Sequence, residues 1–290
     1  MREKITCNLH CKFCNSTNIV HYGCFRGIQR WWCKDCRRKF AQNDALPNMK
    51  TPTAPIATAL SLYYNGTSLN NIQKIIDQKY GFYLSDSTIY NWILRFTALA
   101  IANTSTNVPC LGDIWVANEF QLKIGGHNIW FWDVIDTRTR FLITSYMSMA
   151  HTLEDARILI EQAVSRSEKC SGVVICINKP QDFLKKVGFS RSIKSSRLDV
   201  IGSSYQPIFT IVEPYVTPLE DRTNVIRKLK TLNSTELTLS GWQVHYNYLR
   251  PGNRLGDITP AEKAGLYNTI TNWLDVINQL NGKTSTTTIV

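Results

Sequence analysis

The stretch that decides the fold spans residues 113–136 and reads DIWVANEFQLKIGGHNIWFWDVID. Apolar and polar residues alternate on both sides of the pair Gly125 and Gly126, which is the pattern of two antiparallel strands joined by a tight turn. The segment TRTR at 137–140 turns the chain again, into the alternating run FLITSYMS at 141–148. The sequence therefore predicts a three-stranded meander.

A helix and a buried strand follow this meander. The segment TLEDARILIEQAVSRS at 152–167 has a helical apolar stripe, Thr152 as a cap and acidic residues in its first turn. GVVICIN at 172–178 is an apolar run typical of a buried strand. Three strands, a helix and a further strand form the order of an RNase H-like fold, so we expect an α/β domain with that core.

Two cysteine pairs near the N-terminus predict a zinc ribbon. Cys11-Lys-Phe-Cys14 and Cys33-Lys-Asp-Cys36 are separated by eighteen residues, which suits four thiolates around one structural Zn²⁺. The insert is expected to form two short strands around a turn at 23–27. The alternative is a pair of redox CxxC motifs. The spacing of Cys7, His10 and Cys24 fits a zinc site less well.

Basic residues surround the second cysteine pair and suit a phosphate backbone. A solvated charged face is the alternative interpretation. The candidate DNA-binding residues of this rim are Arg30, Arg37, Arg38 and Lys39.

Three helical segments are expected after a proline-marked linker. They cover 56–66, 69–81 and 84–103, the second capped by Thr67 or Ser68 and the third by Ser85 or Asp86. The apolar stripe of the third segment is expected to be Ile89, Trp92, Ile93 and Phe96. Two helices joined by a short turn suit a helix-turn-helix whose last helix enters the major groove. The alternative is a helical hairpin that only packs. The residues expected to face outward from the third segment are Ser87, Thr88, Tyr90, Asn91 and Arg95.

The composition favours a polyanionic partner. The chain of 290 residues has a formal net charge of +11 and a pI of about 9.2, which fits nucleic acid or an anionic surface. No apolar run is long enough to span a bilayer, and the N-terminal residues lack the apolar core of a signal peptide. We expect a cytoplasmic protein without a membrane partner.

Three motifs in register resemble DDE-type insertion-sequence transposases, most closely the insertion-sequence-six group. That group reads W-x-V-D-E-T where this chain has Trp115-Val-Ala-Asn118-Glu119-Phe. Its second acid lies after the fourth strand, where this chain has Asn178. Its third acid matches Glu213, and the 34 residues between Asn178 and Glu213 are the interval found in the family. The ending GWQVHYNYLRPGNRLGDITPAEKAGL, from 241, closely resembles the family's ending.

The resemblance implies a degenerate catalytic triad at Asn118, Asn178 and Glu213. The family cuts and joins DNA with two divalent metal ions held by carboxylates. An amide oxygen brings no charge to Mg²⁺, so Mg²⁺ binding is not expected. Rescue by a neighbouring acid is the alternative, with Asp136 the less implausible of Asp133 and Asp136.

The sequence thus predicts a transposase-derived, catalytically inactive DNA-binding protein in chromosome organisation or transcriptional regulation. The expected domains are a zinc ribbon at 1–45, a helix-turn-helix at 55–103, an RNase H-like core at 109–280 and a flexible tail at 281–290. The expected partner is double-stranded DNA, bound by a homodimer or higher homo-oligomer on the chromosome or nucleoid of a prokaryote. An active DDE transposase with atypical ligands, a decayed copy without a role and an RNA-binding ribbon protein are the alternatives. Further DNA contacts are expected at Arg222, Arg227, Lys228 and Lys230.

Overall fold

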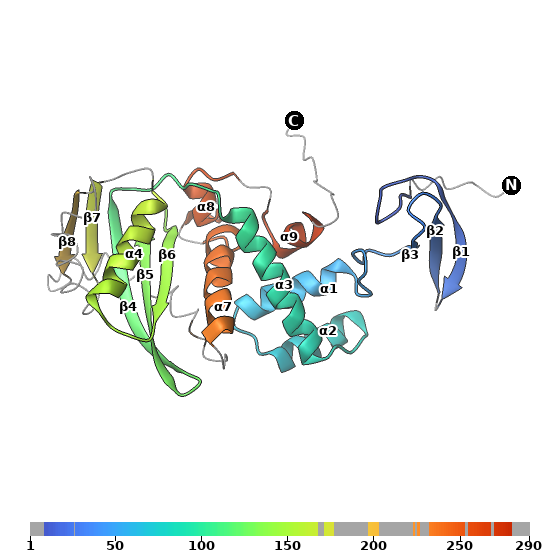
Figure 1. The fold of residues 1–290 in the computed structure, drawn as a ribbon, viewed down its shortest axis with the longest axis horizontal. Helices are drawn as coiled ribbons and strands as arrows, with labels where there is room; N and C mark the ends of the chain where they lie inside the picture. Colours follow the sequence, from blue (N-terminus) through green and yellow to red (C-terminus); the bar gives the residue numbers. More distant parts are fainter. Residues whose placement is uncertain are drawn as a thin grey trace. The chain divides into compact units, whose positions relative to one another are not determined.

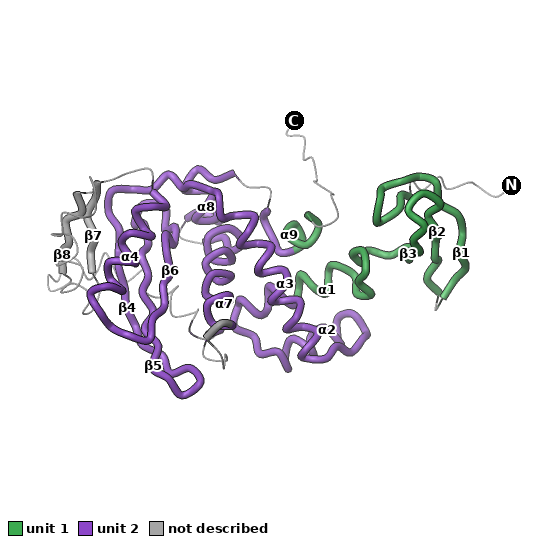
Figure 2. Tube along the Cα trace, viewed as in Figure 1, with its two compact units in different colours: residues 1–58, 274–290 green, residues 59–273 purple. Residues whose placement is uncertain are grey.

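A three-stranded and a five-stranded sheet organise the chain in the computed structural model. Residues 1–58 with 274–290 make up one compact unit and residues 59–273 the other (Figure 2). Each unit is described by itself. The structure describes residues 9–25, 27–167, 171–176, 197–202, 223, 225–226, 232–252, 255–267 and 270–279.

The smaller sheet lies in the N-terminal unit and has the antiparallel order β1-β2-β3. Its strands are β1 (Ile19–Phe25), β2 (Ile28–Cys33) and β3 (Lys39–Ala41). The two strands expected in the insert are present, but the turn between them is shorter than expected. Gly23 belongs to β1, at a register shift with φ 106°, a backbone conformation that L side chains rarely adopt.

Three helices follow in the expected segments, and the first begins three residues before and ends two residues before its expected bounds. They are α1 (Thr53–Tyr64), α2 (Leu69–Tyr80) and α3 (Asp86–Thr104). The hydroxyls of Ser68 and Ser85 accept hydrogen bonds from the backbone N–H groups three residues further on, so these serines cap α2 and α3. The buried stripe of α3 includes the four apolar residues that its periodicity indicates, Ile89, Trp92, Ile93 and Phe96.

The larger sheet has the order β6-β5-β4-β7-β8 (Figure 1). Its strands are β4 (Ile114–Ile124), β5 (His127–Asp136), β6 (Leu142–Ser148), β7 (Ser171–Cys176) and β8 (Arg197–Gly202). The first three form the expected antiparallel meander, and β7 and β8 run parallel to β4. This order and these directions are those of an RNase H-like core, which confirms that part of the expected fold.

Figure 1 shows α4 lying across one face of this sheet and α7 standing beside its β6 edge. On one face, α4 (Leu153–Ser165) packs on β5 and β6, and Thr152 caps it through a reciprocal capping box with Asp155. On the other face, Leu239 of α7 (Leu232–Val244) joins an apolar cluster with Phe131 and Ile226. α3 packs along α7, so the three-helix segment and the sheet share this unit from residue 59 onward.

The free edge of the sheet, at β6, is closed by side chains rather than by another strand. Asn247 accepts a hydrogen bond from the Leu142 N–H at 2.8 Å and donates to the Leu142 carbonyl at 3.0 Å. Gln243 donates to the carbonyls of Leu142 and Ile143, each at 3.0 Å. Both amides therefore satisfy backbone groups that an edge strand would otherwise leave exposed.

Three short helical elements complete the described chain. They are the π-helical turn η1 (His245–Leu249), α8 (Pro260–Lys263) and α9 (Trp273–Gln279). Pro260 occupies the first turn of α8, where the missing N–H has no intrahelical partner to lose. Among the helices of the described residues, none combines the length and the apolar character that a bilayer crossing requires.

Candidate functional site

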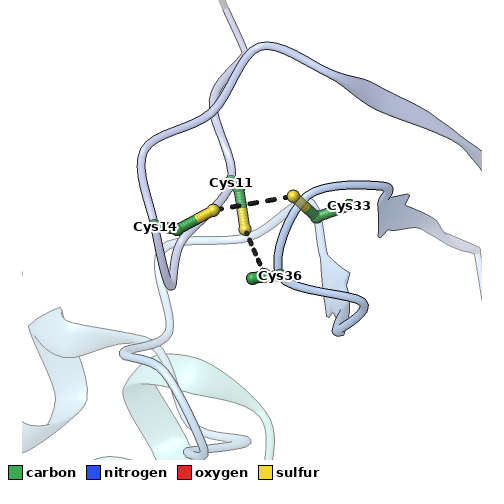
Figure 3. Close-up of side chains that lie close together, drawn as sticks. All are labelled: Cys11, Cys14, Cys33 and Cys36. Carbon is green, nitrogen blue, oxygen red and sulfur yellow. Dashed lines mark hydrogen bonds between the residues drawn. The ribbon is translucent and has the colours of Figure 1, made fainter.

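The four predicted zinc ligands lie together. The Sγ atoms of Cys11, Cys14, Cys33 and Cys36 all lie within 4.8 Å of one another, and Figure 3 shows the four cysteines gathered between their two loops. Cys11 and Cys36 have their sulfurs 3.6 Å apart, as do Cys14 and Cys33. A tetrahedron with Zn–S bonds of about 2.3 Å has edges of about 3.8 Å. The spacing therefore fits one Zn²⁺ and is much longer than the S–S bond of a disulfide.

The backbone prepares both cysteine pairs in the same way. The residue after each pair, Asn15 or Arg37, has a left-handed backbone with φ of 59° and 55°. The Cys11 N–H donates to the Ser16 carbonyl and the Cys33 N–H donates to the Arg38 carbonyl, at 2.9 and 3.0 Å. These matching bonds curl each pair into a loop that turns both of its thiols inward.

The electrostatics of the four thiols also favour a cation. Hydrogen bonding from the backbone amide of Cys36 lowers the pKa of Cys33 to about 7. Burial raises the pKa of Cys36 to about 12. Four thiolates this close repel one another, so a divalent cation is the group that allows all of them to ionise together. Zinc would tie the two pairs together and stabilise the small ribbon.

The predicted basic rim lies on the ribbon but does not form one uniform surface. Arg37, Arg38 and Lys39 are exposed, whereas Arg30 is half-buried. The Arg38 guanidinium lies 5.0 Å from the centre of the Phe13 ring, and Lys39 Nζ lies 3.9 Å from the centre of the Tyr22 ring. These cations are therefore held over aromatic rings as well as presented to solvent.

On α3, three of the five predicted recognition residues form one exposed stripe. Ser87, Asn91 and Arg95 are exposed and recur every four residues, so they share one side of the helix. Thr88 and Tyr90 are half-buried, and the Thr88 hydroxyl is 2.9 Å from that of Ser85. A helix-turn-helix docking of α3 into DNA remains a prediction.

Asn118 occupies the middle of β4, in a polar row across an otherwise apolar face. It pairs with Asp133 of β5, which pairs with Ser145 of β6. Asn118 and Asp133 are 5% and 1% exposed, and the Ser145 hydroxyl donates to Asp133 at 2.6 Å. Directly opposite residues point to the same face. A buried carboxylate therefore lies beside the position where the resemblance expects the first acid.

The apolar rows around Asn118 identify this face. Phe120 and Phe131 stack two residues further along the strands, with ring centres 5.1 Å apart. Leu122 and Ile129 follow, and Leu239 of α7 covers them together with Ile226. The face that bears Asn118 is thus the one on which the C-terminal helical segments pack.

Glu119 lies on the opposite face, because adjacent residues of a strand point to opposite sides. Its carboxylate is 2.7 Å from His151 Nε2, and the His151 ring stacks between Trp130 and Trp132 at 4.0 and 5.0 Å. This group fixes the start of α4 against the sheet, and Glu119 has no direct access to the Asn118 face.

The structure corrects the ranking of the two acids of β5. Asp136 is a turn residue: it accepts hydrogen bonds from the Gly112 N–H at 2.9 Å and from the Thr139 N–H at 2.8 Å. It pairs with Trp115, three residues away from Asn118 along β4. Asp133, and not Asp136, is therefore the acid that faces Asn118. The two-glycine turn fixes this register, because residues equally distant from Gly125 and Gly126 pair with each other.

The remaining predicted site residues lie outside the described residues. β7 ends beside the centre of β4, with Cys176 opposite Ala117, and Asn178 follows two residues later. The residues concerned are Asn178, Glu213, Arg222, Arg227, Lys228 and Lys230.

Comparison with solved structures finds similarity to retroviral integrases. A chain of the simian T-cell lymphotropic virus intasome is 14% identical, with 71% of this chain and 74% of that chain covered and a TM-score of 0.40. The trimeric form of the HTLV-2 integrase catalytic core domain in complex with magnesium is 13% identical, with 54% of this chain and 97% of that chain covered and a TM-score of 0.40. The catalytic core domain of BIV integrase is 16% identical, with 52% of this chain and 93% of that chain covered and a TM-score of 0.35. No protein-family model and no curated protein matches the chain.

Proposed function

We propose that the protein is a transposase-derived DNA-binding protein that has lost metal-dependent strand transfer. Asn118 carries this proposal. It is a buried amide in the middle of β4, on the face whose apolar cluster includes Leu239 of α7, where the resemblance to DDE transposases expects a carboxylate. Because Mg²⁺ prefers charged oxygen ligands, an amide there removes an important part of the attraction for the catalytic ions.

Two surfaces support DNA binding. The ribbon carries the exposed Arg37, Arg38 and Lys39, which suit phosphate contacts. The exposed stripe of α3, with Asn91 and Arg95, offers an amide and a guanidinium of the kinds that read adenine and guanine edges. The ribbon would thus supply affinity and α3 sequence preference.

The expected biological role follows from binding without cleavage. Such a protein would organise the chromosome or regulate transcription, as a homodimer or higher homo-oligomer that connects two duplex sites in the cytoplasm of a prokaryote. The ribbon would hold a structural Zn²⁺, and no Mg²⁺ would be required.

A second candidate function, an active transposase with atypical ligands, is favoured by one observation. Asp133 is a buried carboxylate directly opposite Asn118. Asp133 would have to supply the negative charge that Asn118 lacks. Because Asp133 lies on β5 and not on β4, the metal ion would then lie closer to β5.

The first test is selection of duplexes from a random pool by the zinc-loaded full-length protein. We expect an enriched sequence motif and an affinity that falls steeply with salt. Asn91→Ala and Arg95→Ala should weaken the motif preference, whereas Arg37→Ala and Arg38→Ala should lower affinity for all duplexes about equally.

Arg157→Ala is the matched control for loss of a positive charge. Arg157 donates to Glu154 at 2.9 Å and to Glu161 at 2.6 Å on α4, so its charge is already balanced within the protein. Absence of duplex binding at moderate salt would refute the proposal. Mg²⁺-dependent nicking of a plasmid that disappears in Asp133→Asn would establish the second candidate instead.

A further inference from the structure

The ribbon sheet has one covered and one open face. Cys11, Cys33 and Phe40 are buried on the covered face, with Ile19 and Trp31 packed against them. Strand register places the row Val20, Trp32 and Lys39 on the other face, because adjacent residues of a strand point to opposite sides. In this open row Val20 is exposed and Trp32 is half-buried.

Aromatic rings and cations alternate on this open face. The Tyr22 ring lies beside Trp32 on this face, with ring centres 6.2 Å apart and planes inclined by 29°. Lys39 Nζ lies 3.9 Å from the centre of the Tyr22 ring and also contacts its hydroxyl. The Arg30 guanidinium lies 5.7 Å from the same ring. The two rings and two cations, Tyr22, Trp32, Arg30 and Lys39, are called the aromatic platform below.

The platform is accessible, and its charge is positive. Tyr22 remains 46% exposed, and the hairpin end next to it presents Phe25 at 59% and Ile28 at 41%. Residues 9–45 contain seven Lys and Arg residues but only two Asp residues. Exposed aromatic and apolar side chains beside cations indicate an interaction surface for an anionic partner with flat apolar groups.

Unpaired nucleobases have this chemistry, and paired bases do not. In a duplex the base faces stack on one another, so proteins reach only the base edges and the phosphates. In a single strand the base faces are free to stack on Tyr, Trp or Phe side chains, and the phosphates lie within reach of Lys and Arg. An apolar peptide would use the rings without requiring the cations placed over them.

We propose that the aromatic platform of the ribbon binds single-stranded DNA by stacking unpaired bases on Tyr22 and Trp32, with Lys39 and Arg30 near the phosphates. This inference rests on the proposed DNA-binding function and extends it, because the ribbon would recognise an unwound or unpaired segment beside the duplex. The exposed Arg37 and Arg38 would remain available to duplex phosphates.

The test measures binding of three fluorescent probes to the zinc-loaded full-length protein at about 100 mM salt. The probes are a polythymidine strand of about 15 nucleotides, an abasic strand of the same length, and a duplex. We expect the polythymidine strand to bind at least about tenfold more tightly than the abasic strand, since both have the same phosphates and only one has bases to stack.

Substitutions locate the binding to the platform. Tyr22→Leu and the double variant Tyr22→Leu/Trp32→Leu should lower affinity for polythymidine by about tenfold or more while duplex affinity changes less than about threefold. Tyr267→Leu is the matched control, because Tyr267 is 87% exposed and lies in the other unit. Zinc content of each variant reports whether the ribbon is still folded, and Tyr22→Leu alone preserves the half-buried Trp32.

Each outcome decides the proposal. Equal affinity for the thymidine and abasic strands, or unchanged polythymidine binding by zinc-loaded Tyr22→Leu, overturns it. Tighter binding of a polyuridine strand than of polythymidine overturns the assignment to DNA. Loss of duplex binding with retention of base-dependent strand binding refutes the proposed duplex function but supports this inference, so the two proposals fail separately.

Discussion

Replacing Asn118 by Asp restores the expected acid and places a second carboxylate opposite Asp133. Directly opposite residues of antiparallel strands have Cβ atoms about 5 Å apart. Two unit charges at about 5 Å repel by about 3 kcal/mol at an effective dielectric constant of about 20. Because Asn118 and Asp133 are 5% and 1% exposed, solvent reduces this repulsion little. Without divalent ions, Asn118→Asp should therefore lower the free energy of unfolding by about 3 kcal/mol at neutral pH.

Divalent ions should recover about half of this loss, because a cation between the two carboxylates reduces their repulsion. At a Mg²⁺ or Mn²⁺ concentration about ten times the Kd, binding to the folded state adds about 1.4 kcal/mol. Urea unfolding followed by near-ultraviolet circular dichroism, with and without Mg²⁺, measures both effects on the tryptophan-rich core.

The double variant Asn118→Asp/Asp133→Asn is the control, since it moves the charge to the other strand and restores a single carboxylate. It should regain most of the lost stability, which a double-mutant cycle expresses as a coupling free energy. The reasoning is wrong if Asn118→Asp is as stable as the wild-type protein in metal-free buffer, because the two side chains would then not share a buried site.

Three further predictions concern other parts of the chain. Burial lowers the pKa of His245 to about 3, so the unfolded state takes up a proton before the folded state does as the pH falls below about 6.5. The free energy of unfolding should therefore fall by about 2 to 3 kcal/mol between pH 7 and 4.5. Unfolding measured as a function of pH should show that His245→Phe abolishes this loss. Asn247→Ala leaves the Leu142 N–H without its amide acceptor, while the Leu142 carbonyl keeps Gln243 as a donor, and should destabilise the core by about 1 to 3 kcal/mol in thermal unfolding. Zinc removal, or Cys33→Ser, should unfold the ribbon without changing the core. Residue-resolved hydrogen exchange should then show lost amide protection in the ribbon and unchanged protection in the core.

The meander and helices were predictable because their signals are local. Alternation around the two-glycine turn gives β4 and β5, and Ser68, Ser85 and Thr152 mark three helix starts that the structure confirms. The pairing of Asn118 with Asp133 was also contained in the sequence. It follows from counting outward from the glycines, because residues equally distant from the turn pair with each other.

Other features depend on contacts that no local pattern encodes. β3 has only three residues, Lys39–Ala41, and forms through pairing with β2, so its sequence alone has no strand signal. Which face of the ribbon sheet stays open depends on where the cysteine loops fold back. Asn247 closes the sheet edge 105 residues away along the chain, a distance over which periodicity carries no information.

The site residues divide in the same way. Cysteine spacing predicted all four members of the cysteine cluster, because metal geometry limits how two CxxC pairs can meet. Helical periodicity predicted that Asn91 and Arg95 face outward, but it did not anticipate that Tyr90 is half-buried. The open aromatic platform was not predicted, because alternation places Tyr22 on the same face as Val20 but does not show which face of the sheet the cysteine loops cover.

The central claim is that the transposase-like core has lost its catalytic metal ions while keeping its fold. A calorimetric titration of Mn²⁺ into the zinc-loaded full-length protein tests it most directly, with Asn118→Asp/Asn178→Asp beside the wild type. We expect no binding to the wild type up to about 1 mM Mn²⁺ and measurable binding to the double variant, since carboxylates supply the charge that divalent ions require. Binding of two Mn²⁺ ions by the wild type below about 1 mM would contradict the claim and identify the protein as a metal-dependent enzyme.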